Sequence, residues 1–346
     1  MRDDDRMLDL PNEFGSGIVG VCDICGTRQA VIVLSKERYK LCVIDFLNKT
    51  WIKSEKKPGA PMPLYRSDRV FFETEATASG KAPAIVLTPT RTVRRPSVLV
   101  TPDVFGLTTT VLDGAIRFAR EGFEVMIPDI GKTDAIGPGH HIALRAGARF
   151  GSGVSVRSKR VVSLLHLYTD ALTTVRSRDM VDPGKTALFG ASYGASLALV
   201  VASQDTKIGA VVAAYPYPLS PPDLTKLVTA PVFFVGGRSD RKAQQAKAQL
   251  LAPGRPSSSV VERFEPDGGR HGFLARDLSA YDLPAAELAW AKALAFVKQR
   301  LMPPPPRPPS PPMKPLSAVL PPTPKGAPAP TAKPAAASPA AAPRSA

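Results

Sequence analysis

Between residues 66 and 302, short apolar segments of strand length alternate with longer amphipathic segments of helix length. The runs "PSVLVTP", "FEVMIP" and "APVFFVGG" are each followed, directly or after a loop, by a stretch with helical spacing. This alternation predicts an α/β fold with a mostly parallel sheet and helices on both of its faces. The pair "RVFFETEA" and "APAIVLTP" predicts an antiparallel start to the sheet. Binding sites in such sheets lie at the carboxyl ends of the strands.

Two segments of different composition flank this region. The first 65 residues hold all 3 cysteines and end in the Pro/Gly-rich "KKPGAPMP". From residue 303 on, the chain is rich in Pro, Ala and Ser and has no acidic residue. Such a segment cannot bury enough apolar surface to offset the entropy of ordering it. We therefore predict three parts: a small N-terminal module (1–65), an α/β domain (66–302) and a disordered tail (303–346).

The charge and the hydropathy pattern exclude several classes of partner. The net charge of +15 is spread along the chain, and no stretch interleaves aromatic residues with Arg and Lys as single-strand binders do. We therefore expect no nucleic-acid partner. The chain starts with the polar "MRDDDRMLDL" and has no apolar run of about 18 residues, so we expect neither a signal peptide nor a membrane span. The prediction is a cytoplasmic protein without a disulfide framework.

The pentapeptide "GASYG" at residues 190–194 matches the pattern G-x-S-x-G. By itself such a pattern also fits an ordinary tight turn between a strand and a helix. Here an apolar strand segment precedes it and an Ala/Leu-rich helix segment follows it. A nucleophile elbow needs this context, because a sharp turn exposes the serine hydroxyl and small neighbours relieve the crowding. The pattern therefore favours Ser192 as a reactive serine.

A reactive serine needs a base and an acid, and the chain supplies both in a workable order. Asp240 follows the apolar strand segment "APVFFVGG", and His271 lies in the Gly-rich "PDGGRHGF" after the next strand segment. The sequence thus gives Ser192, then the acid, then the histidine, which is the order used in α/β-hydrolases. His166 lies within a predicted helix, where we expect a packing role. The two histidines of "GPGHH" fit either solvent exposure or substrate contact.

These motifs resemble the dienelactone hydrolase family of the α/β-hydrolase fold. The resemblance is carried by "TPDVFGLTTTVLDGAIRFAREGFEVMIPD", by the elbow "GASYGASLAL", by the acid turn "GGRSD" and by the histidine turn "HGF". It implies a catalytic triad of Ser192, Asp240 and His271, and no cofactor for catalysis. It also implies an oxyanion hole formed by the backbone N–H groups of Tyr193 and Val104.

Two residues depart from the family pattern. The dienelactone hydrolases themselves have cysteine at the elbow, where this chain has Ser192, and their acidic residue near the nucleophile is usually glutamate, where this chain has Asp103. Both departures favour a broader activity on small carboxylic esters or lactones. An anionic substrate would need a cation, for which Arg145, Arg149 and Arg276 are candidates; each is otherwise a solvated surface charge.

The cysteines of the N-terminal module resemble the knuckles of a small zinc ribbon. Cys22 and Cys25 have the required two-residue gap, and Cys42 is followed by Asp45 where a fourth cysteine would be expected. These four residues are candidate ligands for a structural zinc. Two other interpretations stay open: a ribbon that has lost its metal, and a redox-active CxxC pair.

A non-catalytic function is the alternative. The zinc-ribbon-like module and the tail, with its "PPPPRPPSPP", are both features of interaction proteins. The central domain would then be a scaffold between them. The tail itself could bind a protein partner through an aromatic groove, or serve only to keep the protein soluble.

Overall fold

A computed structural model describes residues 65–91, 93–102, 106–130, 153–257, 259–276 and 278–302. Outside these ranges it describes only the backbone of four short strands. They form two antiparallel pairs, β1 (Gly20–Val21) with β2 (Gln29–Ala30) and β3 (Ile32–Leu34) with β4 (Tyr39–Leu41). The tail and the four proposed zinc ligands lie outside the described residues.

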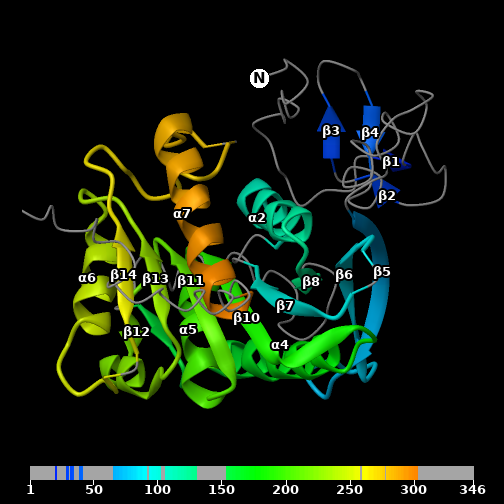
Figure 1. Cartoon of the computed structure of the whole chain (residues 1–346), viewed down its shortest axis with the longest axis horizontal. Coiled ribbons are helices and arrows are strands. Elements are labelled where there is room, and N and C mark those ends of the chain that lie inside the picture. Colours follow the sequence, from blue (N-terminus) through cyan, green and yellow to red (C-terminus); the bar gives the residue numbers. More distant parts are fainter. Residues whose placement is uncertain are drawn as a thin grey trace, which may run out of the picture. The chain divides into compact units, whose positions relative to one another are not determined.

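An eight-stranded sheet forms the centre of the described domain, in the order β14-β13-β11-β10-β7-β8-β6-β5 (Figure 1). The sheet is parallel except where β6 pairs with β5 and with β8. Its strands are β5 (Tyr65–Glu73), β6 (Lys81–Pro89), β7 (Arg95–Thr101), β8 (Glu124–Pro128), β10 (Val181–Ala191), β11 (Ile208–Ala214), β13 (Val232–Val235) and β14 (Val261–Phe264). A short parallel pair, β9 (Val154–Ser155) and β12 (Leu219–Ser220), lies outside this sheet.

Helices cover both faces of the sheet. One face carries α2 (Thr109–Arg120) and α7 (Leu283–Leu301), which also contact each other. The other carries α4 (Lys159–Arg176) and α5 (Tyr193–Gln204) (Figure 1). The shorter α6 (Arg241–Leu250) follows β13 and contacts the 3₁₀ helix η3 (Pro222–Leu227). The predicted α/β fold, with its antiparallel start, is therefore confirmed.

The central strands are buried on both faces, as their continuous apolar sequence predicts. Below the elbow, Phe189 of β10 packs against Trp290 of α7, with ring centroids 5.1 Å apart. Gly114 of α2 permits this contact, because a Cβ there would lie 2.4 Å from the Phe189 ring. Burying an aromatic side chain of this kind contributes about 2–3 kcal/mol. The strand that leads to Ser192 is thus fixed by both helices of this face.

One sequence expectation is wrong. His166, predicted to be a packing residue, is exposed on α4. Its neighbours Leu165 and Leu167 are buried against the rest of the domain, whereas position 166 lies on the opposite, solvent-facing side of the helix. Helical spacing predicts that a residue lies on a helix, but the face that this helix packs against the sheet decides which of its positions reach solvent.

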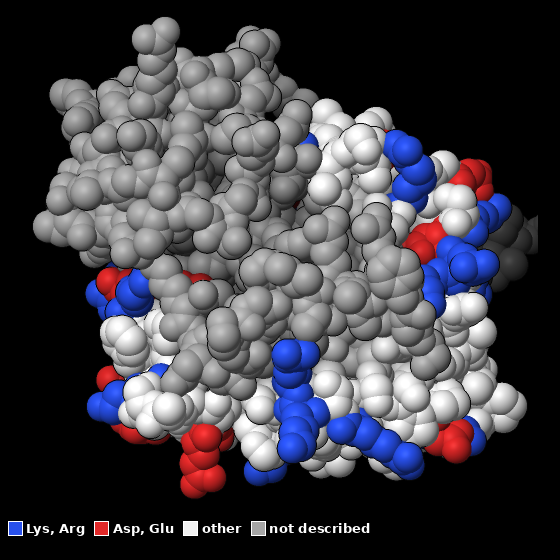
Figure 2. All heavy atoms as spheres, turned by 180° about the vertical axis from the view of Figure 1, so that it is seen from behind, with Lys and Arg blue, Asp and Glu red and all other residues white. Residues whose placement is uncertain are grey.

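The described surface carries both signs of charge. On the face shown in Figure 2, Lys and Arg side chains are interspersed with Asp and Glu side chains on the part that the structure describes. No helix in the described ranges combines the length and the apolar character needed to cross a membrane.

Candidate active site

Ser192 lies at the sharp turn between β10 and α5. Its backbone has φ 56° and ψ −124°, a left-handed region that residues other than glycine rarely adopt. Its N–H donates to the carbonyl oxygen of Ala214 in β11, at 2.8 Å. The turn therefore stores strain, and the neighbouring strand holds it in place. This is the geometry of a nucleophile elbow.

Two glycines flank the serine because backbone groups approach them closely. A Cβ on Gly190 would lie 2.4 Å from the carbonyl oxygen of Gly194. A Cβ on Gly194 would lie 2.1 Å from the carbonyl oxygen of Thr101 in β7. Backbone atoms cannot move aside as a flexible side chain can. Both glycines of G-x-S-x-G are thus required by the fold around Ser192.

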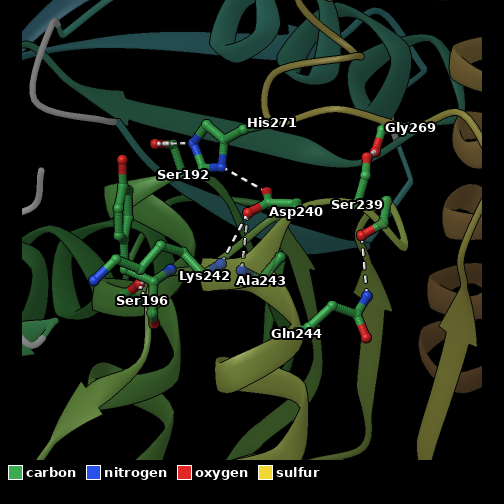
Figure 3. A network of polar contacts seen from close by, with 11 residues as sticks. Ser192, Ser196, Ser239, Asp240, Lys242, Ala243, Gln244, Gly269 and His271 are labelled. Carbon is green, nitrogen blue, oxygen red and sulfur yellow. Dashed lines mark hydrogen bonds and ion pairs between the residues drawn. The ribbon is translucent and has the colours of Figure 1, made fainter.

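Three side chains that are distant in the sequence form a hydrogen-bonded series at the carboxyl edge of the sheet (Figure 3). Ser192 Oγ lies 3.0 Å from His271 Nε2. His271 Nδ1 lies 2.7 Å from Asp240 Oδ2. With the proton on Nδ1, the imidazole donates to the carboxylate and its Nε2 can accept the serine proton. The structure thus brings together all three residues named from the sequence.

Asp240 uses its two carboxylate oxygens for different contacts. Oδ2 accepts from His271, whereas Oδ1 accepts from the backbone N–H groups of Lys242 and Ala243, each at 3.1 Å. Asp240 is thereby the N-cap of α6. Its side chain is only 5% exposed, while that of His271 is 34% exposed. The acid is fixed by a helix end, and the histidine remains open to solvent on one side.

The turn that carries Asp240 and the turn that carries His271 touch through their backbones. A Cβ on Gly237 would lie 1.6 Å from the carbonyl oxygen of Gly269. The hydroxyl of Ser239 donates to the same oxygen at 2.8 Å (Figure 3). The Gly-rich "GGRSD" and "DGGRHG" therefore fit against each other, which sets the separation of the acid and the base.

Two tyrosines line His271, and the sequence reasoning missed them. The rings of Tyr215 and Tyr217 lie 4.9 and 5.3 Å from the imidazole, measured between centroids. The hydroxyl of Ser196, in the first turn of α5, accepts from the N–H of Tyr217 and donates to its carbonyl, both at 2.9 Å. Tyr215 has φ 38°, a left-handed backbone. The signal was the segment "YPYP" directly after β11, at the edge where parallel sheets place their sites.

Tyr193, named for its backbone N–H, is the first residue of α5. The N–H groups of a helix N-terminus favour negative charge, so this position suits an oxyanion. Its side chain is buried, and burial raises the pKa of the Tyr193 hydroxyl to about 12. The phenol therefore stays neutral and belongs to the core. Asp103 and Val104 lie outside the described residues.

Of the three arginines considered for an anionic substrate, the structure describes only Arg276. Its guanidinium lies 3.9 Å from Asp113 of α2 and 3.6 Å from Glu287 of α7. Arg276 is thus neither a freely solvated charge nor a group held apart for a ligand. It forms an ion-pair cluster with both helices of one face.

The described residues contain no group of three or more His, Cys, Asp or Glu side chains arranged to hold a metal ion. The cysteines predicted to bind zinc are not among them.

The family model of the dienelactone hydrolases matches residues 82–301. The chain belongs to the dienelactone hydrolase family. The resemblance seen in the motifs is thereby confirmed, and membership of this family supports a hydrolase activity. A search of curated protein sequences found no match.

Solved structures of the family share the fold of the described domain. A protein from Klebsiella pneumoniae subsp. pneumoniae MGH 78578, named as a dienelactone hydrolase, is 18% identical, with a TM-score of 0.54 over 67% of this chain and 99% of that one. A dienelactone hydrolase-like promiscuous phosphotriesterase from metagenomic libraries is 16% identical, with a TM-score of 0.53 over 69% of this chain and 99% of that one. At these identities the similarity shows the fold alone.

Proposed function

We propose that the protein is a serine hydrolase that cleaves a small carboxylic ester or lactone through an acyl-enzyme intermediate on Ser192. One observation carries the proposal. The strained elbow presents Ser192 Oγ 3.0 Å from His271 Nε2, while His271 Nδ1 lies 2.7 Å from a buried carboxylate. Nucleophile, base and orienting acid therefore stand within hydrogen-bond distance of one another, which is the arrangement that acyl transfer needs.

In the proposed mechanism, His271 Nε2 takes the hydroxyl proton as Ser192 Oγ attacks the carbonyl carbon of the ester. The carbonyl oxygen becomes an oxyanion, stabilised by the N–H of Tyr193 and, as the family resemblance implies, by that of Val104. The bond to the leaving oxygen then breaks, and His271 gives that oxygen its proton. Asp240 stabilises the imidazolium between these steps.

Water completes the proposed cycle. His271 takes a proton from the water molecule as its oxygen attacks the acyl-enzyme. The bond between the acyl carbon and Ser192 Oγ then breaks, His271 gives its proton to Ser192 Oγ, and the carboxylic acid is released. The 34% exposure of the His271 side chain leaves room for the alcohol to depart and for water to enter. No cofactor takes part in these steps.

The test is the substitution Ser192→Ala. We expect turnover of a small aryl ester to fall by roughly a thousandfold or more, with nearly unchanged thermal stability. The matched control is Ser203→Ala, which removes a hydroxyl that donates to the carbonyl oxygen of Val200 within α5 and should keep full turnover. His271→Ala and Asp240→Asn should also lower the rate steeply, and combining them with Ser192→Ala should add little, because the three side chains act as one unit.

Two results would overturn the proposal. One is wild-type turnover by Ser192→Ala. The other is a failure of a serine-directed acylating reagent to label residue 192 in active protein. Either would favour the scaffold function, in which the domain binds partners without catalysis.

The three-part organisation of the chain also stays a proposal. It assigns residues 1–65 to a zinc-ribbon-like module, 66–302 to the hydrolase domain and 303–346 to the tail. Support for the middle part comes from the family match over residues 82–301. The zinc ligands would be Cys22, Cys25, Cys42 and Asp45, and metal analysis of purified protein decides between zinc and a metal-free module.

A further inference from the structure

Thr101, the last residue of β7, lies beside the elbow on the neighbouring strand. It is fully buried and stands opposite Gly190 in the register of β7 and β10. Its Oγ1 lies 2.8 Å from the carbonyl oxygen of Gly194 and 3.2 Å from that of Phe189. One of these carbonyls precedes Ser192 in the chain and the other follows it. A single hydroxyl therefore spans the turn that holds the proposed nucleophile.

The two glycines of the elbow leave the space that Thr101 fills. A Cβ on Gly190 would lie 2.5 Å from Thr101 Oγ1, and a Cβ on Gly194 would lie 2.1 Å from the Thr101 carbonyl oxygen. Thr101 thus contacts the turn from both sides through its hydroxyl and its backbone. Larger residues at either glycine would displace it.

The turn needs an external restraint. The φ of 56° at Ser192 costs free energy and persists only where the surroundings over-determine it. The N–H of Ser192 already bonds Ala214 on the β11 side. Thr101 supplies the matching restraint on the β7 side, where its hydroxyl hydrogen is shared between two carbonyl oxygens.

We propose that Thr101 is a positioning residue for Ser192, whose hydroxyl holds the elbow so that Ser192 Oγ faces His271 Nε2. The same contact fixes the start of α5, and with it the Tyr193 N–H that would face the oxyanion. The proposal rests on the proposed function of Ser192. Thr101 itself touches no reacting atom. Its contribution is to the geometry of attack, where a misplacement of about 1 Å can cost on the order of a hundredfold in rate.

The same pair of strands offers a matched control at its other end. Thr186 of β10 is also fully buried, and it stands opposite Ser97 of β7. Its Oγ1 lies 3.0 Å from Ser97 Oγ. Thr186 Oγ1 also accepts from Arg176 Nε of α4 at 3.2 Å. Thr101→Val and Thr186→Val therefore each remove a buried threonine hydroxyl from the contact between β7 and β10, but only the first removal reaches the elbow.

The experiment compares Thr101→Val, Thr101→Ser and Thr186→Val in the full-length protein. It measures kcat and KM on a small aryl ester, the labelling rate of Ser192 by an acylating reagent, and the melting temperature. We expect Thr101→Val to lower kcat and the labelling rate by about 10- to 100-fold with little change in KM. Thr101→Ser keeps the hydroxyl and should restore most of both rates. Thr186→Val should keep the wild-type kcat per folded molecule, whatever its melting temperature.

Each contrary result has a definite meaning. If Thr101→Val keeps the wild-type kcat, or loses no more than Thr186→Val does, the positioning role is wrong. If Thr101→Ser is as slow as Thr101→Val, the shape of the side chain matters rather than its hydroxyl, and the role is again wrong. If Thr101→Val does not fold, Thr101→Ala carries the same expectation, because it places no methyl group against the two carbonyls. A wild-type protein that is active yet unlabelled at Ser192 would overturn the proposed function, and the role of Thr101 with it.

Discussion

The two ends of strands β7 and β10 are stabilised in opposite ways. At the carboxyl ends, backbone meets backbone through Gly190 and Gly194, and a strained serine is held by neutral hydrogen bonds. At the amino ends, a buried carboxylate is held by two arginines: Glu124 lies 3.2 Å from Arg95 and 2.7 Å from Arg178. At the carboxyl ends, close backbone contacts fix the position of Ser192. At the amino ends, ion pairs hold the strands together.

Substitutions at the charged end should lower the free energy of unfolding more than substitutions at the other end. Glu124 is 1% exposed, and Thr88 adds a third contact at 3.0 Å. Removing one member of a buried ion cluster leaves the others uncompensated in a medium of low dielectric. Thr88, Arg95, Glu124 and Arg178 also line a cavity of about 430 Å³, and none of the residues that line this cavity belongs to the proposed triad. We therefore expect substitutions here to change stability, and substitutions at the carboxyl ends to change the rate.

Among the substitutions that test this comparison between the two ends, the largest effect is expected at Gly194. Gly194→Ala places a Cβ 2.1 Å from the Thr101 carbonyl oxygen, so β7 and the elbow must move apart. We expect ester turnover to fall by on the order of a hundredfold or more, since the nucleophile is displaced. Steady-state kinetics on folded protein measure this.

The control for Gly194 is Gly268, in the turn that carries His271. A Cβ on Gly268 would meet no atom within 4 Å, and Gly268 is not among the glycines with positive φ. Gly268→Ala should therefore keep turnover within about twofold, because exposed substitutions away from such contacts are nearly neutral. Equal losses in the two variants would show that the close contact at the elbow is not what matters.

The next effect is expected at Glu124 and concerns stability. Glu124→Gln leaves Arg95 and Arg178 without their counter-charge, which should lower the free energy of unfolding by about 3 kcal/mol. Chemical denaturation measures this value, and kcat per folded molecule should not change. Asp68→Asn is the control, because Asp68 is 53% exposed and pairs with Arg66, which is 65% exposed. A loss of kcat in folded Glu124→Gln would contradict the expectation that substitutions at the amino ends change only stability.

The smallest effect is expected at Glu287, the exposed counterpart of Glu124. Hydrogen bonds from Arg117 lower the pKa of Glu287 below its ordinary value of 4.5, and its side chain is 46% exposed. Because the pKa of Glu287 is lower in the folded protein than in the unfolded one, the ionised carboxylate stabilises the fold at pH values above the unfolded-state pKa. This stabilisation is lost as the pH falls through the folded-state pKa.

Glu287→Gln should therefore cost only about 0.5 kcal/mol at pH 7, because solvent screens the pair. The difference from wild type should shrink once the pH falls below 4.5. Denaturation curves at several pH values measure it. A difference that stays constant down to low pH would mean that the carboxylate charge contributes nothing.

Much of the fold was predictable from local pattern. The segment "LPAAELAWAKALAFVKQRL" has helical spacing and forms α7, Leu283–Leu301, and Asp282 caps this helix by accepting from the N–H of Ala285. Helical spacing and caps involve residues that are neighbours in the chain, so the sequence expresses them directly. The elbow is local in the same sense, because strand, serine and helix are consecutive.

The candidate site was predictable only in its residue types and their order. Ser192, Asp240 and His271 each follow a strand, and parallel strands end at one edge, so their proximity could be expected. Their distances could not. These depend on contacts such as that between Gly237 and Gly269, where two turns from different strands meet.

By itself, the sequence determined the α/β alternation, the family and the three side chains of the proposed triad. Each of these follows from motifs of consecutive residues or from the order of those motifs along the chain. Only the tertiary structure decided that Tyr217 lines His271, that His166 faces solvent and that Thr101 spans the elbow. Thr101 and Gly194 are 93 residues apart in the chain, and the local sequence around one of them does not predict contact with the other. Such contacts arise from the register in which β7 and β10 pair, and register is set by the packing of the whole sheet.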